Sequence, residues 1–260
     1  MFEKDTYPGG QRIRFSSSLA LLDRAVAEVV AFATSRNASG NLFDLKLLLR
    51  EALLNAVIHG NGSDPLRQVI LEATASEGRL TLGVEDQGEG FDWRERLANP
   101  PSPVATSGRG LTILTLYADD LRFNAAGNRI TLTKIIPGLR GPATESDQAG
   151  QDPTGRRTSM HDIRIEEGRT IFCPTGDIVA SGADALRAQL RDIMHEHPGP
   201  LAIDLTRVEL VDSVGIGLLI AAHNTLAKTG QRLALTHVNA DLAGLLRTMR
   251  LDKHFVIETD

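Results

Sequence analysis

The sequence predicts an α/β protein built in two parts, each with its own β-sheet. The first observation is length, since 260 residues are enough for two ordinary domains that each bury a core. The second is periodicity, because apolar residues recur with helical spacing in some segments and with strand spacing in others along both halves. The third is a stretch rich in Gly, Pro, Ser, Thr, Asp and Gln at 137–160, which is typical of a flexible linker. We therefore expect domains at 1–136 and 161–260.

In the first domain the expected order is strand, two helices, two strands, an irregular segment, a helix and two strands. This order favours a sheet with helices packed on one face, an α/β sandwich. Ser16 to Ser18 offer caps for the first helix. Pro100, Pro101 and Pro103 make 94–106 too rich in proline for regular structure, so this segment is expected to be a lid or an ordered loop. The expected strands are Gln11–Phe15, Arg67–Ala73, Arg79–Glu85, Asp120–Ala125 and Arg129–Ile135, and the expected helices are Leu19–Phe32, Asn41–His59 and Leu111–Tyr117.

A row of polar residues interrupts the second helix, which is otherwise apolar and expected to be mostly buried. Glu51, Asn55 and His59 stand at i, i+4 and i+8, which places a carboxylate, an amide and an imidazole along one face of the helix. Such a row either has partners inside the protein or faces a ligand. The helix alone leaves both interpretations open.

A glycine motif follows the strand that ends at Glu85. In Asp86-Gln-Gly88-Glu-Gly90 the glycines permit a sharp turn and leave room for a flat ligand, while the carboxylate can accept a hydrogen bond from an amino group. A turn without a ligand would use the same glycines. The motif by itself therefore only slightly favours a binding site over a plain turn.

A second glycine motif, Ser107-Gly108-Arg109-Gly110, opens the helix that begins at Leu111. Backbone N–H groups at a helix N-terminus, together with the positive end of the helix dipole, bind phosphate oxygens. Arg109 either adds a charge-assisted contact to such an anion or faces solvent. No strand is followed by Gly-x-x-x-x-Gly-Lys-Ser/Thr, so the chain is not a P-loop protein.

Composition and charge narrow the class of function. The net charge is −5 with no long basic run, which gives nucleic-acid binding little electrostatic support and favours a protein partner or a small anion. Cys173 is the single cysteine, which excludes an intrachain disulfide and a cysteine-rich zinc site. The longest apolar run, Val214–Ala222, is too short to span a bilayer, and the first ten residues lack a signal-peptide core. We expect a cytoplasmic protein without membrane contact.

The second half alternates strands with helices, which predicts a mainly parallel sheet. Asp212 and Ser213 begin one of its helices, and both residue types are preferred helix caps. The expected strands are Asp162–Glu166, Thr170–Pro174, Pro200–Leu205, Arg232–Val238 and Phe255–Glu258, and the expected helices are Asp184–His195, Ser213–Lys228 and Asp241–Arg250.

Taken together and in this order, the motifs of the first half resemble the three boxes of the GHKL ATPase superfamily. The stretch from Glu51 to Gly60 resembles the N box, Asp86 to Gly90 the G1 box, and Ser107 to Leu111 the G2 box. The segments EALLNAVIHGN and SGRGLTIL are most similar to those of bacterial anti-sigma-factor serine kinases. The similarity covers about residues 10–136. Residues 161–260 resemble the STAS domain of anti-sigma-factor antagonists. The resemblance implies a Bergerat-fold α/β sandwich followed by a STAS-type α/β domain.

The resemblance also implies a role for each matching residue. Glu51 corresponds to the general base, and Asn55 to the residue that holds Mg²⁺ against the phosphates of ATP. Asp86 corresponds to the acceptor of the adenine amino group. The remaining assignments are Gly88 and Gly90 for room beside the base, Ser107, Gly108, Arg109 and Gly110 for the phosphates, and Ser213 as the phosphate acceptor of the STAS domain.

The chain departs from these families in three places. Gly127-Asn128 stands where the kinases usually have a Gly-Thr pair whose Thr supports the adenine pocket. In the STAS half, Val214 replaces a usual Ser or Thr, and 176–179 replaces a Gly-Glu-Leu-Asp-like stretch, changes that affect partner choice more than fold. Sensor histidine kinases share the boxes but carry a phospho-accepting His ahead of them, and this chain has no His before His59.

The resemblance implies an ATP-dependent serine kinase and anti-sigma factor that acts in partner-switching control of transcription. Its phosphate acceptor is a serine of a STAS domain, either in another protein or at Ser213 in the same chain. A sigma factor and a second copy of the chain are further expected partners. The alternative is a non-catalytic nucleotide-binding regulator in which the STAS half is an internal inhibitor or a partner-binding module.

Overall fold

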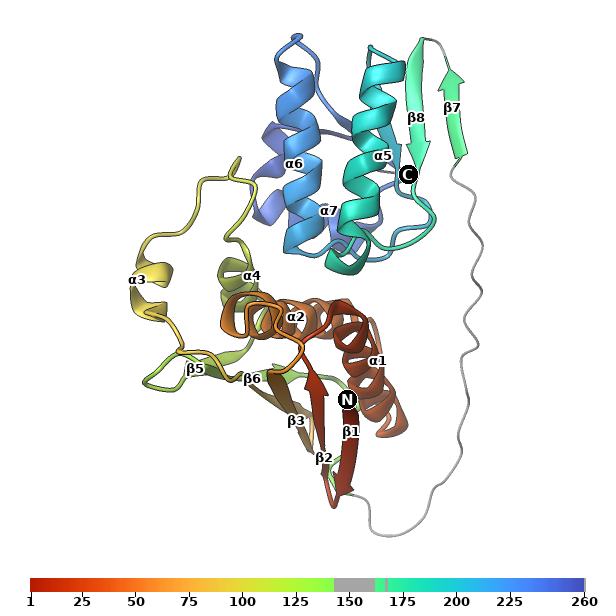
Figure 1. The fold of residues 1–260 in the computed structure, drawn as a ribbon. Coiled ribbons are helices and arrows are strands. Elements are labelled where there is room, and N and C mark those ends of the chain that lie inside the picture. Colours follow the sequence, from red (N-terminus) through yellow and green to blue (C-terminus); the bar gives the residue numbers. More distant parts are fainter. Residues whose placement is uncertain (143–161, 167, 260) are drawn as a thin grey trace. The chain divides into compact units, whose positions relative to one another are not determined.

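The computed structural model describes residues 1–142, 162–166 and 168–259, and these form two compact units (Figure 1). The first unit comprises Met1–Pro100 and the chain from Arg109 to the end of the first half, and the second comprises the C-terminal half together with Pro101–Gly108. Most of the predicted linker, 143–160, lies outside the described residues. Its first residues are hydrogen-bonded to the first unit, since Arg140 N–H donates to the Arg36 carbonyl at 2.8 Å. The domain boundaries stay predictions.

The sheet of the first unit is antiparallel, in the order β1-β2-β3-β4-β6-β5. The predicted strands are confirmed with shifts of at most three residues at their ends, and β4 and β6 have the predicted bounds. The first strand was not predicted, because its side chains are largely exposed and carry no apolar alternation. The strands are β1 Phe2–Tyr7, β2 Gly10–Ser16, β3 Gln68–Ser76, β4 Arg79–Glu85, β5 Asp120–Phe123 and β6 Arg129–Ile135.

Helices α1, α2 and α4 cover one face of the sheet, as predicted, while α3 lies to the side in the segment before α4 (Figure 1). The Ser18 hydroxyl caps the first helix by accepting the N–H of Leu21 at 3.2 Å. The lid, predicted as irregular, contains a short helix whose first turn is capped by Asp92. The helices are α1 Leu19–Ser35, α2 Phe43–Leu54, a π-helical turn Asn55–Gly60, α3 Trp93–Ala98 and α4 Gly110–Tyr117.

One lysine connects the ends of α2, α4 and β6. The ammonium of Lys134 lies 2.9 Å from the carboxylate of Asp44 in the first turn of α2, and it donates to the Tyr117 carbonyl at the end of α4. The ring of Phe43 also packs edge-on against Tyr117. These contacts fix α4 against α2. Glu51 of the N box lies in α2, and Gly110 of the G2 box begins α4.

The second unit has the predicted mainly parallel sheet, in the order β11-β10-β9-β8-β7 with only β7 antiparallel to its neighbour among the described strands. No described helix is both long and apolar enough to cross a membrane. The strands are β7 Asp162–Glu166, β8 Arg169–Cys173, β9 Leu201–Asp204, β10 Ala234–Thr236 and β11 Val256–Ile257. The helices are α5 Ala183–Glu196, α6 Ser213–Ala227, α7 Ala240–Thr248 and the 3₁₀ turns Ala180–Gly182 and Leu251–Lys253.

The start of α6 is held by the motif Asp212-Ser213-Val214-Gly215. The Asp212 side chain is fully buried, and its two carboxylate oxygens accept the N–H groups of Gly215 and Ala180, each at 2.9 Å. Gly215 packs directly on the Ile178 carbonyl, and a Cβ at this position would overlap that oxygen. Two of the four motif residues therefore serve the fold.

We expect Gly215→Ala to destabilise the second unit by about 1–3 kcal/mol, because the methyl group must push the start of α6 away from Ile178. The matched control is Gly244→Ala inside α7, where a Cβ would meet no atom within 4 Å, so that the higher helix propensity of Ala keeps or raises stability. Denaturant midpoints, with hydrogen exchange of the α6 amides, measure both effects. Equal stability of the two variants would contradict this packing.

Candidate functional site

The side chains of Glu51 and Asn55 meet the first residue of α4. Glu51 is only 1% exposed, and a Cβ placed on Gly110 would lie 2.8 Å from its Oε2 and 3.3 Å from Oδ1 of Asn55. The first and third motifs, 55 residues apart in sequence at Asn55 and Gly110, are thus adjacent in space. A side chain at 110 would force the Glu51 carboxyl group to move, because its Oε2 would lie 2.8 Å from the new Cβ.

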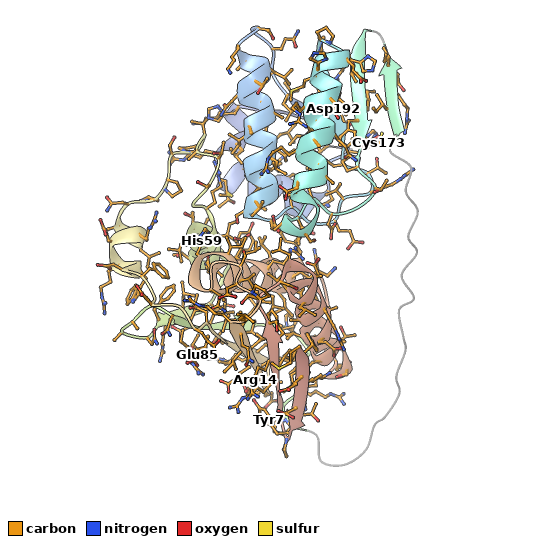
Figure 2. All side chains as sticks on the ribbon, viewed as in Figure 1. Tyr7, Arg14, His59, Glu85, Cys173 and Asp192 are labelled. Atoms are coloured by element: carbon orange, nitrogen blue, oxygen red, sulfur yellow. The ribbon has the colours of Figure 1, made fainter. Side chains whose placement is uncertain are left out.

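The predicted polar row does not continue as an α-helix to His59. From Asn55 the chain forms a π-helical turn, and Asn61 N–H donates to the Ala56 carbonyl five residues back, at 2.8 Å. His59 is exposed, and Figure 2 shows it beside the helices of the first unit. Desolvation, and to a smaller degree the charge of Arg96, lower the pKa of His59. We assign His59 no role in the site.

The π-helical turn ends against the Asp86 motif. A Cβ on Gly60 would overlap the Asp86 carboxyl group, and a Cβ on Gly88 would overlap the Gly60 carbonyl. Asp86 is half-buried, and its Oδ1 accepts the Gly88 N–H at 2.8 Å. Desolvation raises the pKa of Asp86, with a further rise from the neighbouring Glu85, against smaller opposing effects of the Gly88 hydrogen bond and Arg67.

The loop after Asp86 packs against the turn between β5 and β6. Gly90, at φ +81°, lies on the Ala126 carbonyl, and Phe91 N–H donates to that carbonyl at 3.1 Å. A pocket of about 380 Å³ opens beside this contact and is lined by Gly90, Trp93 and their neighbours. It shares only Gly90 with the predicted site residues, so we do not assign it to that site.

The remaining residues of the third motif differ in exposure. Ser107 is exposed, and Gly108 has φ +87°, a left-handed conformation that favours glycine. Arg109 is 2% exposed, so the expectation that it faces solvent is wrong. Desolvation lowers the pKa of Arg109. In the second unit, Ser213 is partly exposed and is the first residue of α6.

The Asp86 loop is held by Asn61, to which the sequence assigned no role, and by Asn128, which stood out only as a departure from the Gly-Thr pair of the kinases. Asn61 is 1% exposed and accepts the Gln87 N–H at 2.8 Å. Asn128 pairs with the main chain of Asp86, and Asn124 bonds to Asn128. Asn61 directly follows the N box. An asparagine between glycines is typical of an ordinary turn, so its contact with the Asp86 loop could not be predicted from the sequence.

Both halves match models of known domain families. Residues 15–134 match the model of the histidine kinase-like ATPase domain, and residues 175–258 match that of the "Mlab, STAS domain". An anti-sigma F factor of Clostridium perfringens is 31% identical over 137 residues, which cover 51% of this chain and 87% of that protein. An anti-sigma F factor of Shouchella clausii is 29% identical over 115 residues, covering 43% and 70% respectively.

Two solved structures resemble part of the chain weakly. An anti-sigma factor antagonist of Thermotoga maritima has a TM-score of 0.37 and 19% identity, and covers 38% of this chain and 86% of that chain. SpoIIAA, an anti-sigma factor antagonist in its unphosphorylated form, has a TM-score of 0.32 and 12% identity, with 39% and 89% covered.

The raised pKa of Asp86 means that the folded chain binds this proton more tightly than the unfolded chain does. The stabilisation of the folded chain by protonated Asp86 is complete below the pKa that Asp86 has in the unfolded chain. It is lost as pH rises through the pKa that Asp86 has in the folded chain. We therefore expect Asp86→Asn to be more stable than the wild type at neutral pH, with the difference disappearing in acid. Urea unfolding at several pH values measures it. Asp5→Asn, at an exposed position of β1, is the control, and a destabilised Asp86→Asn at neutral pH would contradict the assignment.

Proposed function

Since the chain belongs to the family of the anti-sigma F factors, with a histidine kinase-like ATPase half followed by a STAS half, we propose that it is an ATP-dependent kinase that phosphorylates a STAS serine and so controls the availability of a sigma factor. The observation that carries this proposal is the convergence of Glu51 and Asn55 on the first residue of α4. This arrangement puts a carboxyl group and an amide beside a helix N-terminus that suits phosphate oxygens.

Two clusters at the ends of one helical segment support nucleotide binding. Glu51, Asn55 and Gly110 form one cluster, and Gly60 with Asp86 forms the other. Gly60 is nine positions after Glu51, which places the two clusters about two helical turns apart along this segment. We assign the first cluster to the terminal phosphates and the second to the base, because Asp86 can accept the amino group of adenine.

In the proposed reaction, the serine Oγ attacks the γ-phosphorus of ATP, the bond to the β,γ-bridging oxygen breaks, and ADP leaves. Glu51 accepts the serine proton, a role suited to a carboxyl group held in one position by burial. Asn55 would hold Mg²⁺, which fits one amide oxygen together with phosphate oxygens and water. The ion supplies neutralisation of the phosphate charge.

Ser213 is the acceptor that we propose within this chain. It is partly exposed, and it directly follows Asp212, whose carboxylate oxygens accept backbone N–H groups. A phosphate at Ser213 would add a charge of about −1.5 to −2 at the start of α6, where the helix dipole favours negative charge, so the STAS fold is expected to persist. A partner surface that buries this turn beside carboxylates would be released.

We expect Ser213→Ala to abolish phosphate incorporation from labelled ATP, because the acceptor hydroxyl is gone. Ser181→Ala, at an exposed serine of the same unit, is the matched control and should label normally. Glu51→Gln should retain nucleotide binding and lose about 10²- to 10⁴-fold in labelling rate, since the proton acceptor is lost. Intact mass with and without Mg·ATP reports the modification. Label that persists in Ser213→Ala, or ATP bound without any transfer, would contradict the proposal.

We further expect transfer within one chain to dominate in dilute solution. Covalent attachment gives the acceptor an effective concentration of roughly mM. A mixture of Glu51→Gln and Ser213→Ala chains, each at micromolar concentration, labels between chains, apart from the residual rate that Glu51→Gln alone retains. It should react on the order of 10³-fold more slowly than the wild type, which is the ratio of mM to µM. Its rate should rise with concentration, whereas the wild-type rate per chain should not. Equal rates would show transfer between chains.

A further inference from the structure

Two asparagine side chains hold the loop that carries Asp86, one from each side. Asn61 lies on the helix side, after the π-helical turn, and Asn128 lies on the hairpin side, at the start of β6. Their partners are mainly backbone groups. Neither residue belongs to the three motifs of the site.

Asn61 ties the loop to the ends of two strands. Its Oδ1 accepts the Gln87 N–H at 2.8 Å, and its Nδ2 donates to the Ser17 hydroxyl at 2.8 Å and to the Gln68 carbonyl at 2.9 Å. Both amide protons and the carbonyl are thus used inside the protein. A second link runs in parallel, because Gln68 N–H donates to the Gln87 side chain at 2.7 Å.

Asn128 fixes the other side of the loop through the main chain of Asp86. Asp86 N–H donates to the Asn128 carbonyl at 3.0 Å, and the Asn128 amide donates to the Asp86 carbonyl at 3.3 Å. The side chain of Asn128 is itself oriented, since its Oδ1 accepts from the Asn124 amide at 2.7 Å. Asn124 in turn accepts the Gly127 N–H at 2.8 Å.

Ion pairs on the neighbouring residue pair reinforce the register that places Asn128 opposite Asp86. Arg129 pairs with Glu85 across β4 and β6, and its guanidinium lies 2.7 Å from Glu85 and 2.7 Å from Glu72. Figure 2 shows Glu85 at the sheet of the first unit. A slip of one residue would break both ion pairs and would turn Asn128 away from Asp86.

We propose that Asn61 and Asn128 are positioning residues that hold the Asp86 carboxylate where it selects a purine carrying an exocyclic amino group. Their hydrogen bonds fix the main chain on both sides of Asp86, and the Gly88 N–H occupies its Oδ1. A site built to bind an amino group discriminates strongly against an analogue without one only when its acceptor stays in place. This inference rests on the proposed function, because it takes the nucleotide to be the ligand.

The test compares ATP with inosine triphosphate, which has an oxygen in place of the amino group. Dissociation constants with Mg²⁺ are measured by calorimetry for the wild type, Asn61→Ala, Asn128→Ala and Asn128→Thr. We expect the preference for ATP to fall roughly tenfold in the two alanine variants while inosine triphosphate affinity is kept. Asn128→Thr keeps a hydrogen-bond donor and should restore most of the preference. Asn224→Ala, at an exposed position of α6, is the control.

The outcomes separate this inference from the proposed function. If both nucleotides weaken equally in the alanine variants, or if the ratio does not change, the asparagines have only a structural role and the inference is wrong. If the wild type binds both nucleotides with equal affinity, Asp86 does not read the amino group, and the inference fails while nucleotide binding stands. If the wild type binds neither nucleotide, the proposed function fails as well. Should Asn61→Ala not fold, the two Asn128 variants decide.

Discussion

The burial of the Glu51 carboxyl group where α2 meets α4 is the constraint on which the rest of the first unit depends. A carboxyl group out of water is costly unless its surroundings provide polar partners, so the space around it cannot be filled in the usual apolar way. Gly110 leaves that space free of a side chain, and Asn55 adds an amide one helical turn away. Around this point the helix is packed by leucines, which makes the position of Glu51 as rigid as the core.

The change from α- to π-helix after Leu54 serves a second purpose. It lets one continuous segment contact α4 at its beginning and the Asp86 loop at its end, through Gly60. π-helical turns interrupt the regular hydrogen-bond ladder and are frequent at functional sites. Here the interruption falls between the two clusters of the site, and Asn61, at the end of the turn, continues into the hydrogen bonds of the Asp86 loop.

The sequence predicted what depends on local periodicity and on motif order. Strands β4 and β6 were predicted to the residue, because apolar residues alternate along them, and the meeting of Glu51, Asn55 and Gly110 followed from the resemblance. Three features of the structure could not be predicted from the sequence. The exposed strand β1 has no apolar pattern, the burial of Arg109 depends on packing around the start of α4, and the role of Asn61 depends on a partner 26 residues away.

Two aspartates show why residue type alone does not separate fold from function. Asp86 and Asp212 each precede glycines near the start of a motif, and in each a carboxylate oxygen accepts the N–H of a nearby glycine. Asp212 is fully buried, and its second oxygen accepts the Ala180 N–H, so its carboxylate holds the start of α6. Asp86 is only half-buried, and desolvation raises its pKa, which is a cost to folding at neutral pH. This cost, together with the oriented asparagines around it, supports the proposal that the Asp86 carboxylate binds a ligand, whereas beside Asp212 the group proposed to react is the neighbouring Ser213 hydroxyl.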